Sequence, residues 1–233
     1  MLTPLLWKHG WADAYAARND LIAIEFLELV VRPSLAALTN KHQEYAASDD
    51  PVLYGFAAMD QLDLINKTAT AFCLSIQALW ERQLRTYLSN CVKCVPIADI
   101  DPHRLQSAQW GERMDALFLD VRGIDLQSFS SYEMLTVLHL MANVCRHGEG
   151  RSSRELFVKW PHLWPDQASG SVHGLFVSEH LLAGFVDAVV LFWMDMERLG
   201  LESFKGDKPT DRIAFLKCHG QGRLDSINRL LLA

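Results

Sequence analysis

The chain has 233 residues, half of them hydrophobic, so it can bury one sizeable core. Its formal net charge of −6 excludes a protein that coats nucleic acid through a broadly basic surface and allows only a focal basic cleft. No apolar run reaches the roughly 18 residues of a membrane span, and the N-terminus lacks a signal-peptide pattern. We therefore expect a soluble, cytoplasmic protein without a membrane partner.

The N-terminal part predicts helices around a proline. Apolar residues recur every three or four positions over residues 13–45. They are Ile22, Phe26, Leu29, Val30 and Leu35. Pro33 should break or kink this pattern, which gives two helices or one bent helix. Residues 46–51 carry a polar loop signal.

The longest periodic stretch covers residues 59–92 and predicts the spine helix of a bundle. Its predicted core positions share one side of that helix. They are Leu62, Ile65, Ala69, Phe72, Ile76, Leu79, Trp80, Leu84 and Leu88. Glu81 and Arg85 lie one turn apart and can pair, with Arg82 adjacent. The Trp and Phe positions of this helix and of the later long helix have core spacing rather than that of a base-stacking platform.

The second half predicts further helices over 104–119, 134–147, 152–158 and 179–199, with a loop at 123–131. Ser131 and Ser178 mark helix starts, and Pro161 and Pro165 end the short third helix. A basic tail over 201–233 closes with a short amphipathic helix at 224–232. Strand alternation and internal repeats are absent from the sequence. We expect one all-α domain, a helical bundle with its core over about 60–200 and an N-terminal helical extension over 1–50.

A compact polar stripe runs along the otherwise apolar helix predicted at 134–147. Its members fall within roughly one 100° arc. They are Thr136, His139, Asn143, Arg146 and His147. Gly148 and Gly150 should end this helix directly after His147. The stripe would then finish at the C-terminal end of the helix, where the His147 imidazole can reach solvent. Burying polar groups costs free energy unless they are hydrogen-bonded or serve a function. The stripe is therefore either a hydrogen-bonded structural network or a functional site.

Other motifs carry less chemistry. Cys91-x-x-Cys94 has zinc-ligand spacing, and His103 or Cys218-His219 would have to complete the site, but no second CxxC or HxxxH pair exists. We therefore expect no metal, no cofactor, and five cysteines present as reduced core thiols. Gly148-Glu-Gly150 and Gly220-Gln-Gly222 follow no strand, so both are interpreted as helix stops rather than nucleotide loops.

The segment from Asn143 to Ser152, NVCRHGEGRS, resembles the N-x-x-K/R-H-G-x-G-x-S segment of a group of bacterial proteins similar to the HEPN superfamily. Trp80-Glu81-Arg82, the region from Leu156 to Leu163, and Phe192-Trp193 also fit that group in order and spacing. The likeness spans about residues 60–200. In the superfamily's usual motif an arginine precedes the polar residue, and here that position holds Ala142.

The resemblance implies a HEPN-type bundle and a homodimer, since many members are dimeric ribonucleases of toxin–antitoxin and anti-phage systems. It implies metal-independent endonucleolytic cleavage of RNA, in which the 2′-hydroxyl is the nucleophile. His147 would be base or acid, Asn143 would orient it, and His139 could be a second proton-transfer group. Arg146, or Arg82 or Arg85 beside Glu81, would supply the positive charge that Ala142 lacks.

A competing interpretation is a non-catalytic helical module: a sensor, an antitoxin-like partner protein, or a subunit whose stripe binds a partner or small ligand. Ala142 and the acidic net charge favour it. The adjacency of Arg146 and His147 at an accessible helix end favours the ribonuclease.

Overall fold

The computed structural model of the chain describes residues 10–94, 100–164, 171–203 and 206–232, and within them it is all-α, without a strand. Ten α-helices occur in these ranges. They are α1 (Gly10–Ala16), α2 (Asn19–Phe26), α3 (Arg32–Ala46), α4 (Pro51–Cys94), α5 (Pro102–Ser107), α6 (Glu112–Arg122), α7 (Tyr132–His147), α8 (Arg151–Lys159), α9 (Glu179–Glu202) and α10 (Thr210–Leu231). Four short turns of 3₁₀ or π-helix join them. These are η1 (Leu27–Val31), η2 (Leu126–Ser128), η3 (Pro161–Leu163) and η4 (Val172–Gly174).

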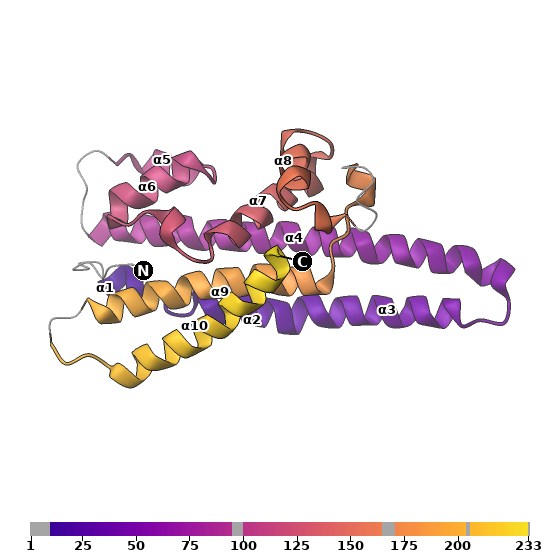
Figure 1. The fold of residues 1–233 in the computed structure, drawn as a ribbon, viewed down its shortest axis with the longest axis horizontal. Helices are drawn as coiled ribbons and strands as arrows, with labels where there is room; N and C mark the ends of the chain where they lie inside the picture. Colours follow the sequence, from indigo (N-terminus) through magenta and orange to yellow (C-terminus); the bar gives the residue numbers. More distant parts are fainter. Residues whose placement is uncertain (1–9, 95–99, 165–170, 204–205, 233) are drawn as a thin grey trace.

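The spine helix α4 runs the length of the molecule (Figure 1). Its 44 residues make it about 66 Å long at 1.5 Å per residue. The first half of α4 packs against α3, and the second half packs against α1, α7 and α9. The predicted spine is therefore confirmed and is longer than expected. The prediction that Leu62 is a core residue is wrong: it is exposed, because this part of α4 has α3 as its neighbour on one side only.

An aromatic cluster joins α4 to α9 and confirms the core assignment of their Trp and Phe residues. The rings of Trp80 and Phe192 are fully buried, with centroids 4.7 Å apart in an edge-to-face arrangement. Trp193 packs edge-on against both Trp80 and Tyr87. Edge-to-face pairs of this kind add stability beyond the apolar area they bury.

The break expected near Pro33 is a π-turn, η1, directly before the proline in α3. A π-turn holds more residues than an α-turn, so it changes which side chains face the core. The buried residues recur every four positions. They are Ala23, Leu27, Val31 and Leu35. Leu35 is thus a core residue as predicted and Phe26 packs edge-on against Phe72, but Ile22, Leu29 and Val30 are exposed.

Two helix boundaries depart from the predictions. The helix expected at 104–119 is divided into α5 and α6, because Gly111 has a positive φ of 96° and starts α6 anew. The tail is not a short terminal helix: α10 has 22 residues and packs along α9. Gly220 and Gly222 lie inside it, so their assignment as helix stops is wrong. A Cβ at Gly220 would lie 3.3 Å from Leu191 Cδ1, which shows how closely the two helices approach.

Other boundaries agree with the predictions, except that the helix expected from residue 13 is interrupted between α1 and α2 at residues 17–18. The loop at 46–51 separates α3 from α4, and α7 ends at His147, where Gly148 has a φ of 72°. Ser178 caps α9 by accepting a hydrogen bond from the backbone N–H of Leu181 at 3.0 Å. Ser131 directly precedes α7, but its side chain makes no capping hydrogen bond. The predicted stop at Pro165 lies outside the described residues. None of the described helices is both long and apolar enough to span a lipid bilayer.

Candidate functional site between α4 and α7

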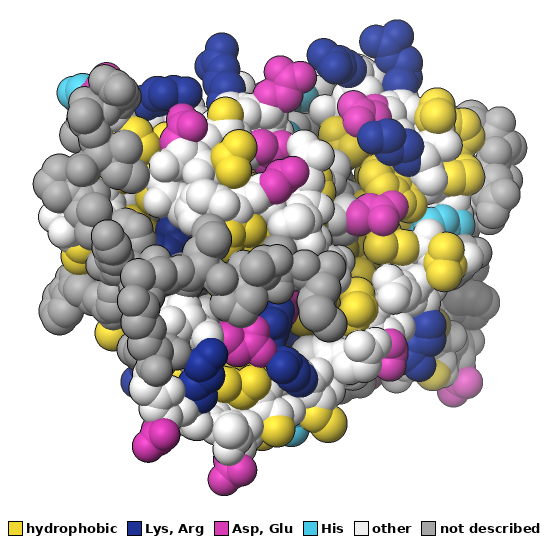
Figure 2. All heavy atoms as spheres, turned by 60° about the vertical axis from the view of Figure 1, so that its left-hand side comes forward, with side chains coloured by type: hydrophobic (Ala, Val, Ile, Leu, Met, Phe, Trp, Pro, Cys, Tyr) yellow, Lys and Arg dark blue, Asp and Glu magenta, His cyan; other side chains and the backbone are white. Residues whose placement is uncertain are grey.

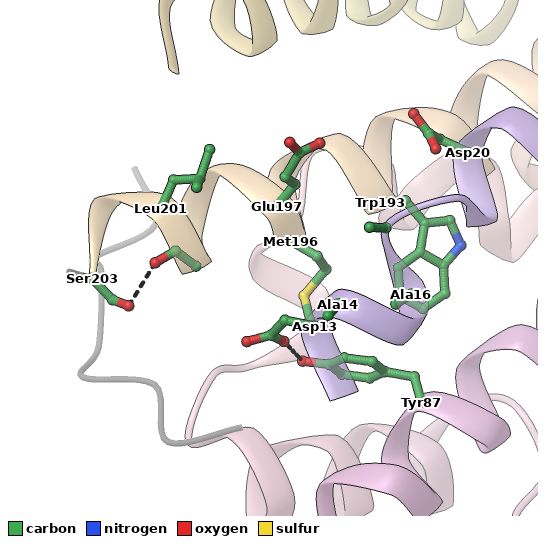
Figure 3. A pocket seen from close by; sticks show the side chains of 12 residues that line it. Asp13, Ala14, Ala16, Asp20, Tyr87, Trp193, Met196, Glu197, Leu201 and Ser203 are labelled. Atoms are coloured by element: carbon green, nitrogen blue, oxygen red, sulfur yellow. Dashed lines mark hydrogen bonds between the residues drawn. The ribbon is translucent and has the colours of Figure 1, made fainter. Parts of the chain in front are cut away.

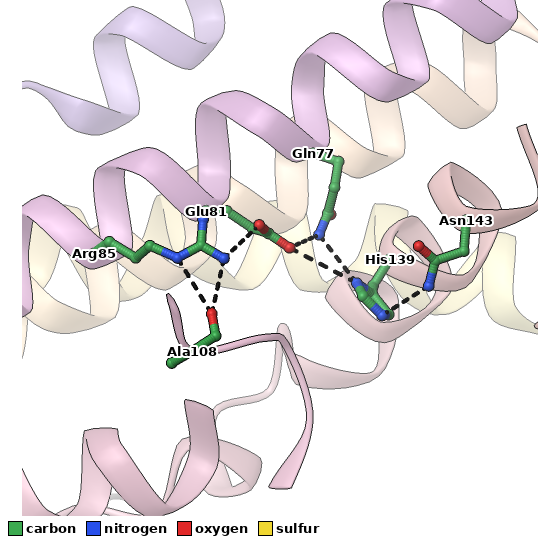
Figure 4. A network of polar contacts seen from close by, with 6 residues as sticks. All are labelled: Gln77, Glu81, Arg85, Ala108, His139 and Asn143. Atoms are coloured by element: carbon green, nitrogen blue, oxygen red, sulfur yellow. Dashed lines mark hydrogen bonds and ion pairs between the residues drawn. The ribbon is translucent and has the colours of Figure 1, made fainter. Parts of the chain in front are cut away.

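Glu81 and Arg85 form the ion pair that their one-turn spacing predicts. Arg85 Nη2 donates to Glu81 Oε2 at 2.7 Å, and both side chains are mostly buried. The same guanidinium donates from Nη2 and Nε to the Ala108 carbonyl oxygen at 2.8 and 3.3 Å (Figure 4). Arg85 is therefore held in place by α4 and by the segment after α5.

His139 of α7 faces this pair and joins the two helices (Figure 4). Its Nδ1 lies 3.8 Å from Glu81 Oε1. Asn143 Nδ2 donates to His139 Nε2 at 2.9 Å. With Nε2 accepting, the proton of a neutral imidazole sits on Nδ1 and faces the carboxylate. Asn143 thus holds His139, whereas the helical spacing also allowed His147.

Gln77, one turn before Glu81, completes the network. Its Nε2 donates to Glu81 Oε1 at 2.7 Å and lies 3.3 Å from His139 Nδ1. The side chain is almost fully buried, and its Oε1 has no hydrogen-bond partner in the described part of the chain. Gln77 was not predicted from the sequence, although it lies four residues, or one helical turn, before Glu81, where the two side chains can interact.

The surroundings of Glu81 keep it ionised. Burial alone would raise its pKa, but hydrogen bonds from His139, Arg85 and Gln77, together with the positive charge of Arg85, outweigh burial and lower the pKa to about 2. At neutral pH the network is therefore built around a permanent carboxylate.

A cavity of about 330 Å³ opens beside the network. Its lining includes Glu81, Arg82 and Arg85 from α4 and Arg146 from α7. Arg82 and Arg146 are exposed and have no ion-pair partner within the described ranges. Three guanidiniums and one carboxylate leave two uncompensated positive charges here, which suits a phosphate group.

His147 lies apart from this cavity. It is the last residue of α7, exposed to solvent, and it is not among the residues that line the cavity. Eight residues separate it from His139, or about 12 Å along the helix axis. The two histidines of one chain therefore do not flank a single phosphodiester. Thr136, the first residue of the stripe, donates to the Tyr132 carbonyl oxygen and stays out of the network.

Ala142, at the position where the superfamily's motif carries an arginine, is 1% exposed. It lies on the face of α7 that packs into the core, so an arginine there would not reach the cavity by a simple side-chain exchange. Arg146, one turn later on α7, lines the cavity instead.

The cysteines show a different division from the one expected. All five lie in the described ranges and are free thiols, but only Cys73 and Cys91 are buried, while Cys94 and Cys218 are exposed. Cys145 of α7 contacts Cys73 of α4, and this contact together with burial raises the pKa of the Cys73 thiol. Across the described residues, no three His, Cys, Asp or Glu side chains gather into a metal-binding group.

Basic and acidic side chains are interspersed on the face seen in Figure 2, without a wide field of one sign. No family model, no curated protein and no solved structure matches this chain. The interpretation of the site consequently rests on its own residues.

Proposed function

We propose that the protein is a HEPN-like, metal-independent endoribonuclease that binds RNA at the cavity between α4 and α7. One observation carries the proposal: Arg82 and Arg146, more than 60 positions apart in the sequence, line the same cavity, and each has a free guanidinium. Guanidiniums of this kind bind phosphate by paired hydrogen bonds.

The chemistry that the resemblance implies needs little from the protein. The substrate's own 2′-oxygen attacks phosphorus, so the enzyme supplies a base for its proton, an acid for the leaving 5′-oxygen, and cations for the developing charge. Arg146 and Arg82 serve as the cations. His147, next to Arg146 and exposed to solvent outside the cavity, serves as base or acid.

His139 and Asn143 act in this proposal as positioning residues. Both nitrogens of His139 face partners, Asn143 on one side and the Glu81–Gln77 pair on the other. The imidazole therefore fixes α7 against α4, and with it the place of Arg146. A second histidine for one phosphodiester would come from a second copy of the chain, which agrees with the homodimer that the resemblance implies.

The direct test incubates the purified full-length chain with single-stranded RNA, with and without EDTA. We expect cleavage in both samples and 2′,3′-cyclic phosphate ends on the products. Cleavage that stops with EDTA, or ends that carry 3′-hydroxyls, would contradict the mechanism. Toxicity of the expressed chain in bacterial cells, lost in the His147→Ala variant, would support a role as a toxin or defence effector.

Buried Ala142 favours a second candidate, the non-catalytic module. Without an arginine at that position, the stripe and cavity could bind a partner protein or RNA without cutting it. RNA binding that depends on Arg82 and Arg146 but yields no products under any condition would support this module instead of the nuclease.

A further inference from the structure

A second cavity, of about 310 Å³, lies between α1, α2, α4 and α9 (Figure 3). Its volume is in the range of pockets that hold small molecules. Tyr87 of α4 and Trp193 and Met196 of α9 form apolar walls, and the cavity shares no lining residue with the site at Glu81. The inference drawn from it goes beyond the proposed function and does not depend on it.

The aromatic walls are held rigidly from behind. The Tyr87 hydroxyl donates to Asp13 Oδ1 at 2.8 Å, and Trp193 Nε1 donates to Gln83 Oε1 at 2.9 Å. The two rings pack edge-on with centroids 5.6 Å apart. Their polar atoms are already paired, so both side chains face the cavity as apolar walls, with 2% of Tyr87 and 4% of Trp193 exposed.

Small residues leave the space open. Ala14, Ala16 and Ala17, at the end of α1 and just beyond it, line the cavity opposite the larger side chains of α4 and α9. Ala14 and Ala17 are exposed, so the cavity is reached from solvent past these residues.

The charges on the lining are of one sign. Three carboxylates line the cavity, those of Asp13, Asp20 and Glu197, and no lysine or arginine is among its described lining residues. Two of them are compensated from outside: Asp13 lies 3.8 Å from Arg122 Nη2, and Glu197 accepts two hydrogen bonds from Arg212 at 2.7 Å.

Asp20 is offset less directly, through the more distant positive charge of Arg212. Its carboxylate accepts a hydrogen bond from the backbone N–H of Leu21 at 2.8 Å and has no ion-pair partner among the described residues. Burial is the largest effect on Asp20 and raises its pKa. The negative charge of Glu197 adds to this, while the hydrogen bond from the Leu21 backbone and the positive charge of Arg212 partly oppose it. A cationic group placed beside Asp20 would stabilise the ionised form of its carboxylate.

We propose that this cavity binds an organic amine, with the ammonium group beside Asp20 and the apolar body against Trp193, Tyr87 and Met196. Ammonium groups bind carboxylates by charge-assisted hydrogen bonds, and three carboxylates line this cavity. Anionic ligands are disfavoured, because the three lining carboxylates outnumber the two arginines, Arg122 and Arg212, that offset them from outside the lining.

The test is calorimetric titration of the full-length protein with four amines: tryptamine, phenethylamine, hexylamine and spermidine. Indole-3-propionate is the matched anion for tryptamine. We expect at least one amine to bind with a Kd of about 1 mM or tighter and the anion not to bind. No heat of binding from any of the four at up to about 10 mM, or equal binding of the anion, would overturn the proposal.

Variants locate the site. Asp20→Asn should weaken amine binding about 10- to 100-fold, the range of a lost charge-assisted hydrogen bond. Glu25→Gln, the same charge change at an exposed position of α2 outside the cavity, should leave binding unchanged.

Ala17→Trp, at an exposed position, should fill the cavity and abolish binding while the melting temperature stays near that of the parent. Amine binding that survives both Asp20→Asn and Ala17→Trp would place the ligand elsewhere and overturn the proposal. The RNA assay reports separately on the site at Glu81.

Discussion

Asn143 Nδ2 lies 2.9 Å from His139 Nε2, so one residue of the polar stripe is used to hold another on the same helix. His139 in turn reaches Glu81 across the interface with α4. This pair divides the stripe into two parts. His139 and Asn143 form a network, while Arg146 and His147 stay free at the end of α7.

His147→Ala is expected to abolish RNA cleavage and leave the melting temperature nearly unchanged, because the exposed imidazole has little packing to lose. His139→Ala should lower the melting temperature by several degrees, since it removes the link between α7 and Glu81. Thermal unfolding and RNA cleavage are measured on both variants. A His147→Ala protein that melts lower yet cuts as well as the parent would make the stripe a structural feature only.

Arg146→Ala and Arg82→Ala are each expected to slow RNA cleavage by about 10²- to 10³-fold, because each removes a cation from the developing charge at phosphorus. Arg113→Ala is the matched control: this arginine is exposed on α6 and does not line the cavity. Single-turnover rates measure the effect. Equal losses in all three variants would indicate a general effect of net charge rather than a site.

Stability should depend on pH through Glu81. Its pKa in the folded protein is about 2, below the usual 4.5, so ionised Glu81 stabilises the fold fully above the usual value. That contribution is lost as the pH falls from 4.5 towards 2. Urea unfolding across this interval should therefore show a steeper loss of stability for the parent than for Glu81→Gln. Parallel curves for the two proteins would contradict the proposed environment of Glu81.

The two Gly-x-Gly segments should respond oppositely to alanine. Gly222 lies inside α10 with nothing near its missing Cβ, so Gly222→Ala should raise stability by about 0.5–1 kcal/mol. Gly148 has a φ of 72°, which strains any residue with a side chain, so Gly148→Ala should lower stability. Chemical denaturation measures the change in the free energy of unfolding for both variants. Destabilisation by Gly222→Ala would mean that α10 is interrupted there.

Gln83 is a buried amide that links three elements. It accepts from Trp193 Nε1 at 2.9 Å and donates to the Asn19 carbonyl oxygen at 3.0 Å. Gln83→Met keeps the side-chain volume but leaves Trp193 Nε1 and the Asn19 carbonyl oxygen without a hydrogen-bond partner. The free energy of unfolding should therefore fall by about 1–3 kcal/mol. Gln106→Met, an exposed glutamine, serves as the control. An unchanged melting temperature for Gln83→Met would show that water replaces both hydrogen bonds.

Several features could be predicted because they depend on local order along the chain. The period of apolar residues placed α4, α7 and α9, the glycine at 148 placed the end of α7, and a spacing of four paired Glu81 with Arg85. Each of these depends on neighbours within a turn or two. The prediction for α10 was wrong because the role of its glycines depends on the partner helix that packs against it.

The amino-acid sequence by itself determined which residues share a helix face, and so it placed His139, Asn143 and Arg146 on one stripe. Only the tertiary structure decided what that stripe meets. Packing of α7 on α4 puts His139 against Glu81 and brings Arg146 to the cavity with Arg82. Separately, the π-turn η1 between α2 and α3 sets a register in which Ala23, Leu27 and Val31 are buried. Helical periodicity is a property of consecutive residues, whereas these contacts join positions about 60 residues apart, and no local pattern along one helix encodes the rotation of its partner.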